Sequence, residues 1–260
     1  SDLLYSELID EKNKVIYLAP FAGSTKILKY NLDGTFVTDY DLGERLNKPK
    51  LSLNPDGSIS LVHLCFQGMS EMMGAVITPD STITKYIPAP GQAINPRDKN
   101  GSFVGFNNEI WSYNNVEGFK YMMMPVDTLY NYNAAANKME AQFALSNPPV
   151  GEDVFLIYDE LPGKYLATVW GKGTIVVDNK NNNSHYVKLV NDYFGGLPAP
   201  MNFTNGWFFA MYEPAVLMEN IEKRMAASDC TDKDKELLKD LLGSLDENDN
   251  NVMFIGKLKK

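Results

Sequence analysis

Residues 26–40 read KILKYNLDGTFVTDY, which is two alternating apolar runs joined by Asp33-Gly34. Alternation of apolar and polar side chains is typical of a half-buried β-strand, because successive side chains point to opposite faces of a sheet. An Asp-Gly pair between two such runs indicates a tight hairpin, since both central positions of the turn need a positive φ angle, which Gly adopts freely and Asp tolerates. The sequence therefore predicts an antiparallel hairpin over residues 26–40.

Turn centres of the same kind recur along the chain. Each places Pro, Asp, Asn or Gly between strand-like runs, as at Pro55-Asp56-Gly57, Pro79-Asp80-Ser81, Asn107-Asn108, Ala135-Ala136-Asn137, Leu161-Pro162-Gly163, Asn181-Asn182 and Asn205-Gly206. A pair of hairpins thus returns about every 45 to 50 residues, near the period of a four-stranded propeller blade. We expect an all-β fold, a β-propeller of four-stranded antiparallel blades, in a single domain over residues 1–260.

About five blade-sized segments follow one another. The first four cover residues 4–43, 50–88, 102–143 and 154–189, and the last pairs residues 206–212 with the terminal run 251–258. Within the third segment we expect strands at residues 102–106, 109–113, 128–132 and 139–143. The run Tyr121-Met122-Met123-Met124 is interpreted as a further buried strand.

Between the last two strands the apolar period changes from two to about 3.6 residues, which is typical of helices. Leu217 and Ile221 lie at helical spacing, and a second apolar stripe runs through Leu237, Leu238, Leu241, Leu242 and Leu245. Thr231, followed by Asp232 and Asp234, has the character of a helix N-cap and an acidic first turn. We therefore predict a helical insertion over about residues 213–245, which either packs on the propeller or binds a partner.

The charge balance argues against nucleic acid as a partner. The chain of 260 residues has 24 Lys and Arg against 33 Asp and Glu, a net charge of -9, and its arginines are Arg45, Arg97 and Arg224. Because Arg supplies the bidentate contacts to phosphate and guanine, an acidic chain with few arginines is a poor match to DNA, RNA or an anionic membrane surface. No apolar run approaches the length of about 18 residues that a transmembrane helix needs, and Ser1 begins no signal peptide.

Three motifs in the C-terminal two thirds resemble those of a known family. They are Val126-Asp127-Thr128-Leu129-Tyr130, the loop Asn191-Asp192-Tyr193-Phe194-Gly195-Gly196-Leu197-Pro198, and the acidic, Asn-rich run at residues 245–253 that leads into the last strand. In this order, with the helical insertion before the tail, they resemble the six-bladed, TolB-like β-propeller lipoproteins of unknown function from Bacteroidetes. The resemblance implies six blades and a place in the cell envelope, periplasmic or anchored to the outer membrane.

Two features depart from this family. Asn251 stands where the family usually has Pro, which affects only a local turn. Family members are also longer and carry an N-terminal lipidated Cys and additional blades, neither of which precedes Ser1. The resemblance thus implies a lipid anchor upstream of Ser1 in a longer chain, and the alternative is a shortened propeller.

No motif for catalysis, cofactor or metal binding is found in the sequence. Gly-x-Ser-x-Gly, His-Glu-x-x-His and Walker sequences are absent. His63 and His185 both lie in strand patterns and are interpreted as structural, and Cys65 and Cys230 as unlinked thiols. The run from Asp246 resembles the start of a calcium loop, but Asn251 and Lys257 replace the Gly and Glu that such a loop needs. We expect no cofactor and no metal.

The predicted ligand-binding residues combine carboxylates, amides and aromatic rings in loops. They are Asp159, Glu160, Trp170, Asn191, Asp192 and Tyr193. Aromatic faces stack on sugars and fill protein interfaces, although Trp111, Trp170 and Trp207 also fit core positions between blades. We hypothesise a non-catalytic binding or scaffold protein of the cell envelope with a protein or carbohydrate partner. The alternative is a glycan-acting enzyme, a hydrolase or lyase, that uses Asp159 or Glu160 as acid or base; the pair Glu152-Asp153 is a weaker match.

Overall fold

The structure is a computed structural model that describes residues 3–21, 23–124, 126–147, 156–200 and 202–259. Contacts divide the chain into two compact units, residues 1–148 and residues 149–260, and each unit is described by itself. The expectation of one domain over residues 1–260 therefore stays a prediction.

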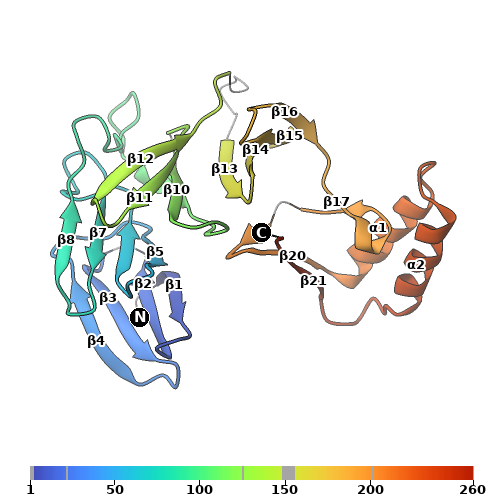
Figure 1. Ribbon diagram of the computed structural model, residues 1–260, viewed down its shortest axis with the longest axis horizontal. Coiled ribbons are helices and arrows are strands. Elements are labelled where there is room, and N and C mark those ends of the chain that lie inside the picture. Colours follow the sequence, from blue (N-terminus) through green and yellow to red (C-terminus); the bar gives the residue numbers. More distant parts are fainter. Residues whose placement is uncertain (1–2, 22, 125, 148–155, 201, 260) are drawn as a thin grey trace. The chain divides into compact units, whose positions relative to one another are not determined.

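The first unit contains three consecutive four-stranded antiparallel sheets (Figure 1). In every sheet the strands pair in chain order, so each sheet is a meander like a propeller blade. The strands are β1 (Leu4–Asp10), β2 (Val15–Pro20), β3 (Lys26–Asn31) and β4 (Phe36–Asp41), then β5 (Lys50–Leu53), β6 (Ile59–Val62), β7 (Gly74–Ile77) and β8 (Ile83–Tyr86), then β9 (Ile110–Trp111), β10 (Phe119–Met123), β11 (Leu129–Asn133) and β12 (Lys138–Phe143).

The hairpin predicted over residues 26–40 is confirmed as β3 and β4, but its turn is wider than expected. Only Gly34 of the Asp33-Gly34 pair has a positive φ angle, +89°, and Asn31 N donates to Thr35 O at 2.8 Å. The Asp33 carboxylate accepts from Thr35 N at 2.9 Å. The β5–β6 turn repeats this arrangement, because Asn54 N donates to Ser58 O at 2.8 Å and Asp56 accepts from Ser58 N at 2.9 Å.

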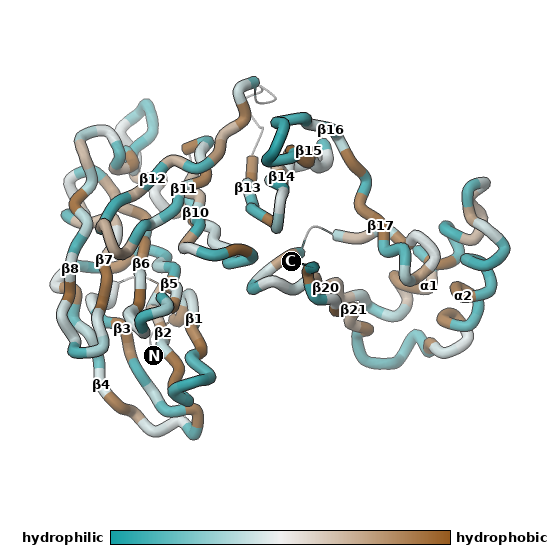
Figure 2. The backbone as a smooth tube through the Cα atoms, viewed as in Figure 1, coloured by the Kyte–Doolittle hydropathy of each residue, from teal (hydrophilic) through white to brown (hydrophobic). Residues whose placement is uncertain are grey.

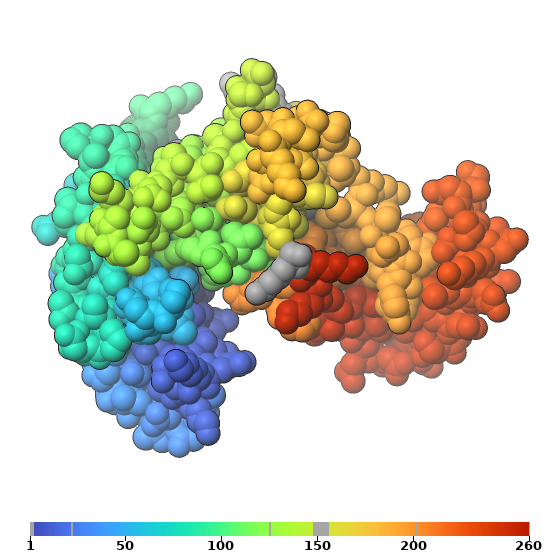
Figure 3. Space-filling view, in the orientation of Figure 1, coloured from blue at the N-terminus to red at the C-terminus, as the bar shows by residue number. Residues whose placement is uncertain are grey.

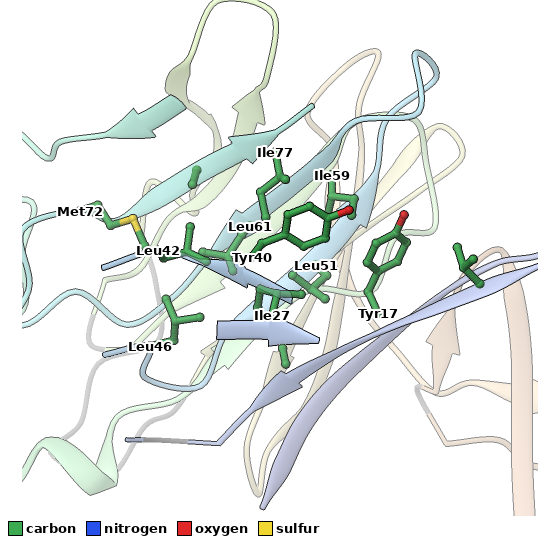
Figure 4. Close-up of a cluster of buried hydrophobic side chains, with 13 residues drawn as sticks. Tyr17, Ile27, Tyr40, Leu42, Leu46, Leu51, Ile59, Leu61, Met72 and Ile77 are labelled. Atoms are coloured by element: carbon green, nitrogen blue, oxygen red, sulfur yellow. The ribbon is translucent and has the colours of Figure 1, made fainter. Parts of the chain in front are cut away.

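The middle sheet is buried on both faces. All four residues of β6 and of β7 are buried, and Figure 2 shows the hydrophobic colour along β7. On one face, Leu61 and its neighbours pack against Tyr17, Ile27 and Tyr40 of the first sheet (Figure 4). On the other face, a second buried cluster joins the middle sheet to the third sheet, through Val62, Met73, Val76, Ile110, Phe119, Tyr121 and Tyr132. Consecutive meanders packed face to face are the blades of a propeller, so the predicted fold class is confirmed.

Each of these sheets has two ends with different connections. The hairpin turns after the first and third strand of each sheet lie at one end, called the turn side, and include residues 11–14, 54–58 and 134–137. The connections after the second and fourth strands lie at the opposite end, called the loop side. The first strands β1 and β5 contact each other, so they are the inner strands of neighbouring blades.

The second unit begins with a fourth four-stranded meander and ends with a three-stranded sheet. Its strands are β13 (Leu156–Leu161), β14 (Lys164–Val169), β15 (Gly173–Asp178) and β16 (Ser184–Val187), the short pair β17 (Val190–Asn191) and β18 (Leu197–Pro198), and then β19 (Phe203–Thr204), β20 (Trp207–Tyr212) and β21 (Val252–Lys257). Two short 3-10 helices complete the described elements, η1 (Gly105–Asn107) and η2 (Asp192–Phe194). The expectation of about five blade-sized segments is confirmed, with three strands described in the last.

The helical insertion is confirmed between β20 and β21, as α1 (Pro214–Met225) and α2 (Asp232–Gly243). Thr231 caps α2 as expected, and it forms a capping box with Asp234. Leu217 and Ile221 of α1 and Leu238 of α2 pack in one buried cluster with residues of β20 and β21, so the insertion is a core-packing element of the last blade. Among the described elements, neither of these helices nor any other is long and apolar enough to span a membrane.

The expected strand at residues 102–106 is wrong. This run belongs to the long connection between β8 and β9, where Phe103 forms only an isolated bridge with Arg97 and residues 105–107 form η1. The Phe103 ring packs edge-on against Phe106, with centroids 5.1 Å apart, and a Cβ on Gly105 would lie 2.6 Å from that ring. The chain thus folds back on its own aromatic side chains, and the alternation that resembled a strand arises from this local packing.

A substitution at Gly74 tests the close packing of the second and third sheets. In Gly74→Ala the new Cβ would lie 2.7 Å from Met139 Cε and 2.8 Å from the Leu61 carbonyl oxygen, which is backbone and cannot move freely. We expect urea denaturation to show a free energy of unfolding lower by about 1–3 kcal/mol. Gly256→Ala is the control, because no described atom beyond its two chain neighbours lies within 4 Å of its added Cβ. Equal stability of the two variants would contradict the packing described.

Candidate functional site

The structure separates Trp170 from Glu160, two of the predicted ligand-binding residues. Glu160 lies on β13 opposite Tyr165, whereas Trp170 follows Val169, which pairs with Leu156 at the other end of the same hairpin. Glu160 and Leu156 are four residues apart along β13, so these two ends of the hairpin lie about 13 Å apart. Asp159 and Glu160 are adjacent in β13, so their side chains leave the sheet on opposite faces. A binding role for these residues stays a prediction, and Glu152-Asp153 lies outside the described residues.

The predicted residues Asn191, Asp192 and Tyr193 lie at η2, beside α2. Asn191 Oδ1 accepts from Phe194 N at 3.3 Å and so caps η2. Gly195 and Gly196 both have positive φ angles, and added Cβ atoms would meet Leu238 at 2.9 Å and Arg224 at 3.0 Å. The Gly-Gly pair therefore permits this loop to lie close to both α1 and α2. Asp192 is exposed, and Tyr193, at 76% exposure, lines an open cavity against α2, so a binding role for both stays a prediction.

The aromatic and histidine expectations hold only in part. Trp170 and Trp207 are exposed at 67% and 42%, so they are not core residues as their strand positions had indicated. His185 is exposed on β16, whereas His63 is fully buried. Asn47 N donates to His63 Nδ1 at 3.3 Å, so the proton of the neutral ring is on Nε2, which lies 3.0 Å from Met72 O and 3.4 Å from Glu44 Oε1. The structural interpretation of His63 is confirmed.

Both cysteines are buried and free, as expected. Burial, with the nearby Glu44 carboxylate as a second cause, raises the pKa of Cys65 to about 11, so this thiol is unreactive at neutral pH. Within the part of the chain that the structure describes, no cluster of three or more His, Cys, Asp and Glu side chains could hold a metal ion.

A polar cluster on the loop side ties the inner strands of the first unit together. Tyr5 on β1 donates to Glu109, which directly precedes β9, and Lys48 Nζ lies 2.9 Å from Glu109 Oε2. Burial raises the pKa of Glu109, but hydrogen bonds from Tyr5, the Ile110 amide and Lys48 outweigh it, so the pKa lies below its usual value. Both carboxylate oxygens are engaged, which fits a structural role.

A cavity of about 480 Å³ opens on the turn side, between the first and second sheets. This volume is in the range of small-molecule sites. Its walls come from the β1–β2, β5–β6 and β7–β8 turns, and its floor is part of the buried cluster in Figure 4. The polar residues that line it include Asp10, Tyr17, Lys29, Tyr40, Asn54 and Asp56.

Two largely buried tyrosines on this floor have hydroxyl groups that open into the cavity. Tyr17 and Tyr40 are only 5% and 7% exposed, and their ring centroids are 6.5 Å apart. Figure 4 shows the two hydroxyl oxygens directed to the same side. No protein hydrogen-bond partner of either hydroxyl is found among the described residues, although both residues line the cavity. Neither hydroxyl oxygen is among the fully buried unpaired polar atoms of the described residues, so both are open to solvent in the cavity and can bond to a ligand that displaces water there.

Charged groups of both signs border the same cavity. Burial raises the pKa of Asp10, but hydrogen bonds from Asn13 and the Lys12 amide outweigh it, so Asp10 is a carboxylate at neutral pH. Burial and the Asp10 charge raise the pKa of Tyr17, so its hydroxyl keeps its proton. Lys29 Nζ lies 5.4 Å from the centroid of the Tyr17 ring. The cavity thus offers hydroxyl groups, an anionic acceptor and a cationic donor around a polar ligand.

A second cavity of about 590 Å³ lies on the other side of the β5–β6 turn, between the second and third sheets. Its floor is apolar, and includes Val76, Phe119 and Tyr132, each at most 8% exposed. Its rim carries Asn131, Asn133 and Asn137 from the β11–β12 hairpin. Figure 3 shows this face, with the light blue β5–β6 turn between the dark blue β1–β2 turn and the yellow-green β11–β12 turn.

Neither cavity was predicted from the sequence. Tyr17 and Tyr40 have the spacing of strand residues that face a core, and nothing in the local sequence shows that their hydroxyl groups open into a cavity. One feature of the sequence could have indicated the first cavity. The other inward positions of these strands hold apolar residues such as Val15, Ala19 and Ile27, whereas a Tyr placed there needs a hydrogen-bond partner for its hydroxyl group.

Comparison with solved structures supports the fold. A candidate exported protein of Bacteroides fragilis superposes with a TM-score of 0.58 at 14% identity, over 99% of this chain and 78% of that chain. The dihydro-heme d1 dehydrogenase NirN, in complex with DHE, superposes with a TM-score of 0.47 at 12% identity, over 80% of this chain and 40% of that chain. The extracellular domain of a candidate one-component system from B. thetaiotaomicron superposes with a TM-score of 0.35 at 13% identity, over 77% of this chain and 29% of that chain.

Only the first of these superpositions is close enough to indicate a common fold, and identities this low show the fold alone. No protein-family model and no curated protein matches the sequence. The site must therefore be interpreted from its own chemistry.

Proposed function

We propose that this protein is a non-catalytic binding protein that holds a neutral saccharide in the cavity between its first two blades. The observation that carries the proposal is the pair of hydroxyl groups of Tyr17 and Tyr40, which open into the cavity from largely buried residues and have no protein partner among the described residues. In a propeller, the blades form a rigid scaffold and recognition belongs to the surfaces between and around them.

A hydroxyl-rich ligand fits the cavity better than a simple ion does. The Asp10 carboxylate can only accept hydrogen bonds, the Lys29 ammonium can only donate them, and the two phenols can do both. A sugar hydroxyl also donates and accepts, so a ligand of this class can bond to either phenol and is compatible with both charged groups. A carboxylate or phosphate ligand would lie beside the negatively charged Asp10, and an ammonium ligand would lie beside Lys29.

We further propose that the protein works in the cell envelope, as a six-bladed TolB-like propeller lipoprotein with a lipid anchor upstream of Ser1. Support comes from the three motifs at residues 126–130, 191–198 and 245–253, and from the similarity in fold to a candidate exported protein of Bacteroides fragilis. Fractionation of the native host, followed by mass analysis of the mature N-terminus, tests this location. A cytoplasmic protein without lipid would contradict it.

Titration calorimetry with a panel of neutral monosaccharides tests the binding function. We use glucose, galactose, mannose and N-acetylglucosamine as probes, and expect at least one to bind. Tyr17→Phe and Tyr40→Phe should each weaken binding of that sugar about 3- to 10-fold, because each removes one hydrogen bond to the ligand. Neither change should lower the melting temperature, since neither hydroxyl has a protein partner to lose among the described residues.

Tyr121→Phe is the matched control. Tyr121 is 1% exposed and its hydroxyl is also unpaired among the described residues, but it lines neither cavity. Its removal should leave sugar affinity unchanged. The proposal fails if no sugar of the panel binds, or if all three Tyr→Phe variants bind as the unaltered protein does.

The same panel, extended to oligosaccharides, decides the alternative of a glycan-acting enzyme. Product formation that is abolished by Asp159→Asn or Glu160→Gln would replace the binding proposal with catalysis in the second unit. Weakened binding in Trp170→Ala or Tyr193→Ala, with the Tyr17→Phe variant unaffected, would instead move the binding site to the loops that the sequence indicated.

A further inference from the structure

We propose that the ligand is an oligosaccharide chain rather than a single sugar, and that it crosses the β5–β6 turn so that consecutive residues occupy the two cavities of the turn side. This inference rests on the proposed saccharide-binding function. It adds a second subsite and a preference for chain length.

The two cavities share one wall. Asn54, Pro55, Asp56 and Thr78 line both of them, so a ligand that leaves the first cavity over this turn enters the second directly. Pro55 and Asp56 are exposed at the crest of the turn, and Figure 3 shows the turn between the two flanking hairpins. A single ligand can therefore contact all three blades of the first unit.

The shared wall is held rigidly by its own hydrogen bonds. Asn54 Nδ2 donates to the hydroxyl oxygens of Ser58 and Ser60, at 2.9 Å each. The Asp56 carboxylate accepts from Ser58 N at 2.9 Å and from Ser58 Oγ at 2.6 Å. A wall with this shape before binding loses little conformational freedom when a ligand lies across it, which favours affinity.

The chemistry of the two cavities is complementary to a chain of pyranose rings. The first cavity presents hydroxyl and charged groups, which suit the polar edge of a sugar. The second presents Val76 and Phe119 beneath its rim, and the polar groups of Tyr132 and Asn137 are already paired, because Tyr132 OH donates to Asn137 Oδ1 at 2.7 Å. This apolar floor suits the C–H face of a ring or an acetyl group. A saccharide chain offers both surfaces in successive residues.

Calorimetry with a chain-length series tests the second subsite. The probes are glucose, cellobiose and cellotetraose, and N-acetylglucosamine with its β-1,4-linked dimer and tetramer. We expect affinity to rise at least about tenfold from monomer to tetramer in one series. Ala135→Trp should remove this rise and leave the affinity for the monomer unchanged, because exposed Ala135 lines the second cavity only.

Ala136→Trp is the matched control, since Ala136 is the next exposed residue of the same hairpin and lines neither cavity. It should keep the full dependence on chain length. Equal affinity for monomer and tetramer, or a rise that survives Ala135→Trp, would overturn the second subsite and leave the proposed function standing. Absence of binding by every probe would overturn both.

Discussion

We expect Leu61→Ala to lower the free energy of unfolding by about 3–5 kcal/mol. Leu61 is 0% exposed in β6, the second strand of the middle sheet, and Figure 4 shows it among Tyr40, Leu51 and Ile59. The substitution removes buried methyl groups between two sheets that are each held by their own hydrogen bonds, so the space cannot easily collapse. Urea denaturation followed by far-UV circular dichroism measures the loss.

Leu32→Ala is the control for this prediction. Leu32 lies in the β3–β4 turn of the neighbouring sheet and is 52% exposed, so its truncation should change stability by no more than about 0.5 kcal/mol. If Leu61→Ala and Leu32→Ala were equally mild, the first two sheets would not pack as blades. The fold class itself would then be in doubt.

Local turn chemistry explains why the blades could be predicted from the sequence. The runs Asn31-Leu32-Asp33-Gly34-Thr35 and Asn54-Pro55-Asp56-Gly57-Ser58 form the same turn, with one Gly at positive φ and an Asp carboxylate bound to the amide two residues later. These interactions lie within five residues, so a single sequence contains all the information needed. The capping box at Thr231 and Asp234 was predictable for the same reason.

Features that depend on contacts between sheets were not predictable. The β8–β9 connection contains a strand-like alternation, yet Phe103 packs on Phe66 and Phe106 and extends no sheet. Trp170 and Trp207 occupy strand or strand-end positions, but both are exposed among the described residues of their unit. The propensity of a residue for strands reflects a pleated, half-buried surface, and only the tertiary structure decides which surface is covered.

The cavity between the first two blades shows the same limit at the level of function. Tyr17 and Tyr40 come from different strands of one sheet, and the opposite wall comes from turns of the next sheet. Their hydroxyl groups qualify as binding groups because tertiary packing opens them into a cavity without partners among the described residues, which no motif records. Residues chosen from the sequence for loop position and aromatic character lie instead in the second unit.

Glu44→Ala should also destabilise the protein strongly, by about 2–4 kcal/mol at neutral pH. The Glu44 carboxylate is 12% exposed and accepts from Glu71 N at 2.9 Å and from Met72 N at 3.1 Å, beside the buried His63 ring. Its removal leaves two backbone amides of the β6–β7 connection without these acceptors. Glu71→Ala is the matched control, because the Glu71 side chain is exposed and should contribute less than about 0.5 kcal/mol.

The pH dependence of this effect follows from the pKa of Glu44. Burial raises that pKa, but hydrogen bonds from His63 and from the amides of Glu71 and Met72 outweigh burial and hold it below the usual value of 4.5. A carboxyl group whose pKa is lower in the folded state contributes stability above its unfolded pKa and loses it as the pH falls through the folded pKa. The difference in unfolding free energy between Glu44→Ala and the unaltered protein should therefore be largest near pH 7 and shrink toward about pH 3. A difference that stays constant over this range would show that Glu44 acts through packing and not through its charge.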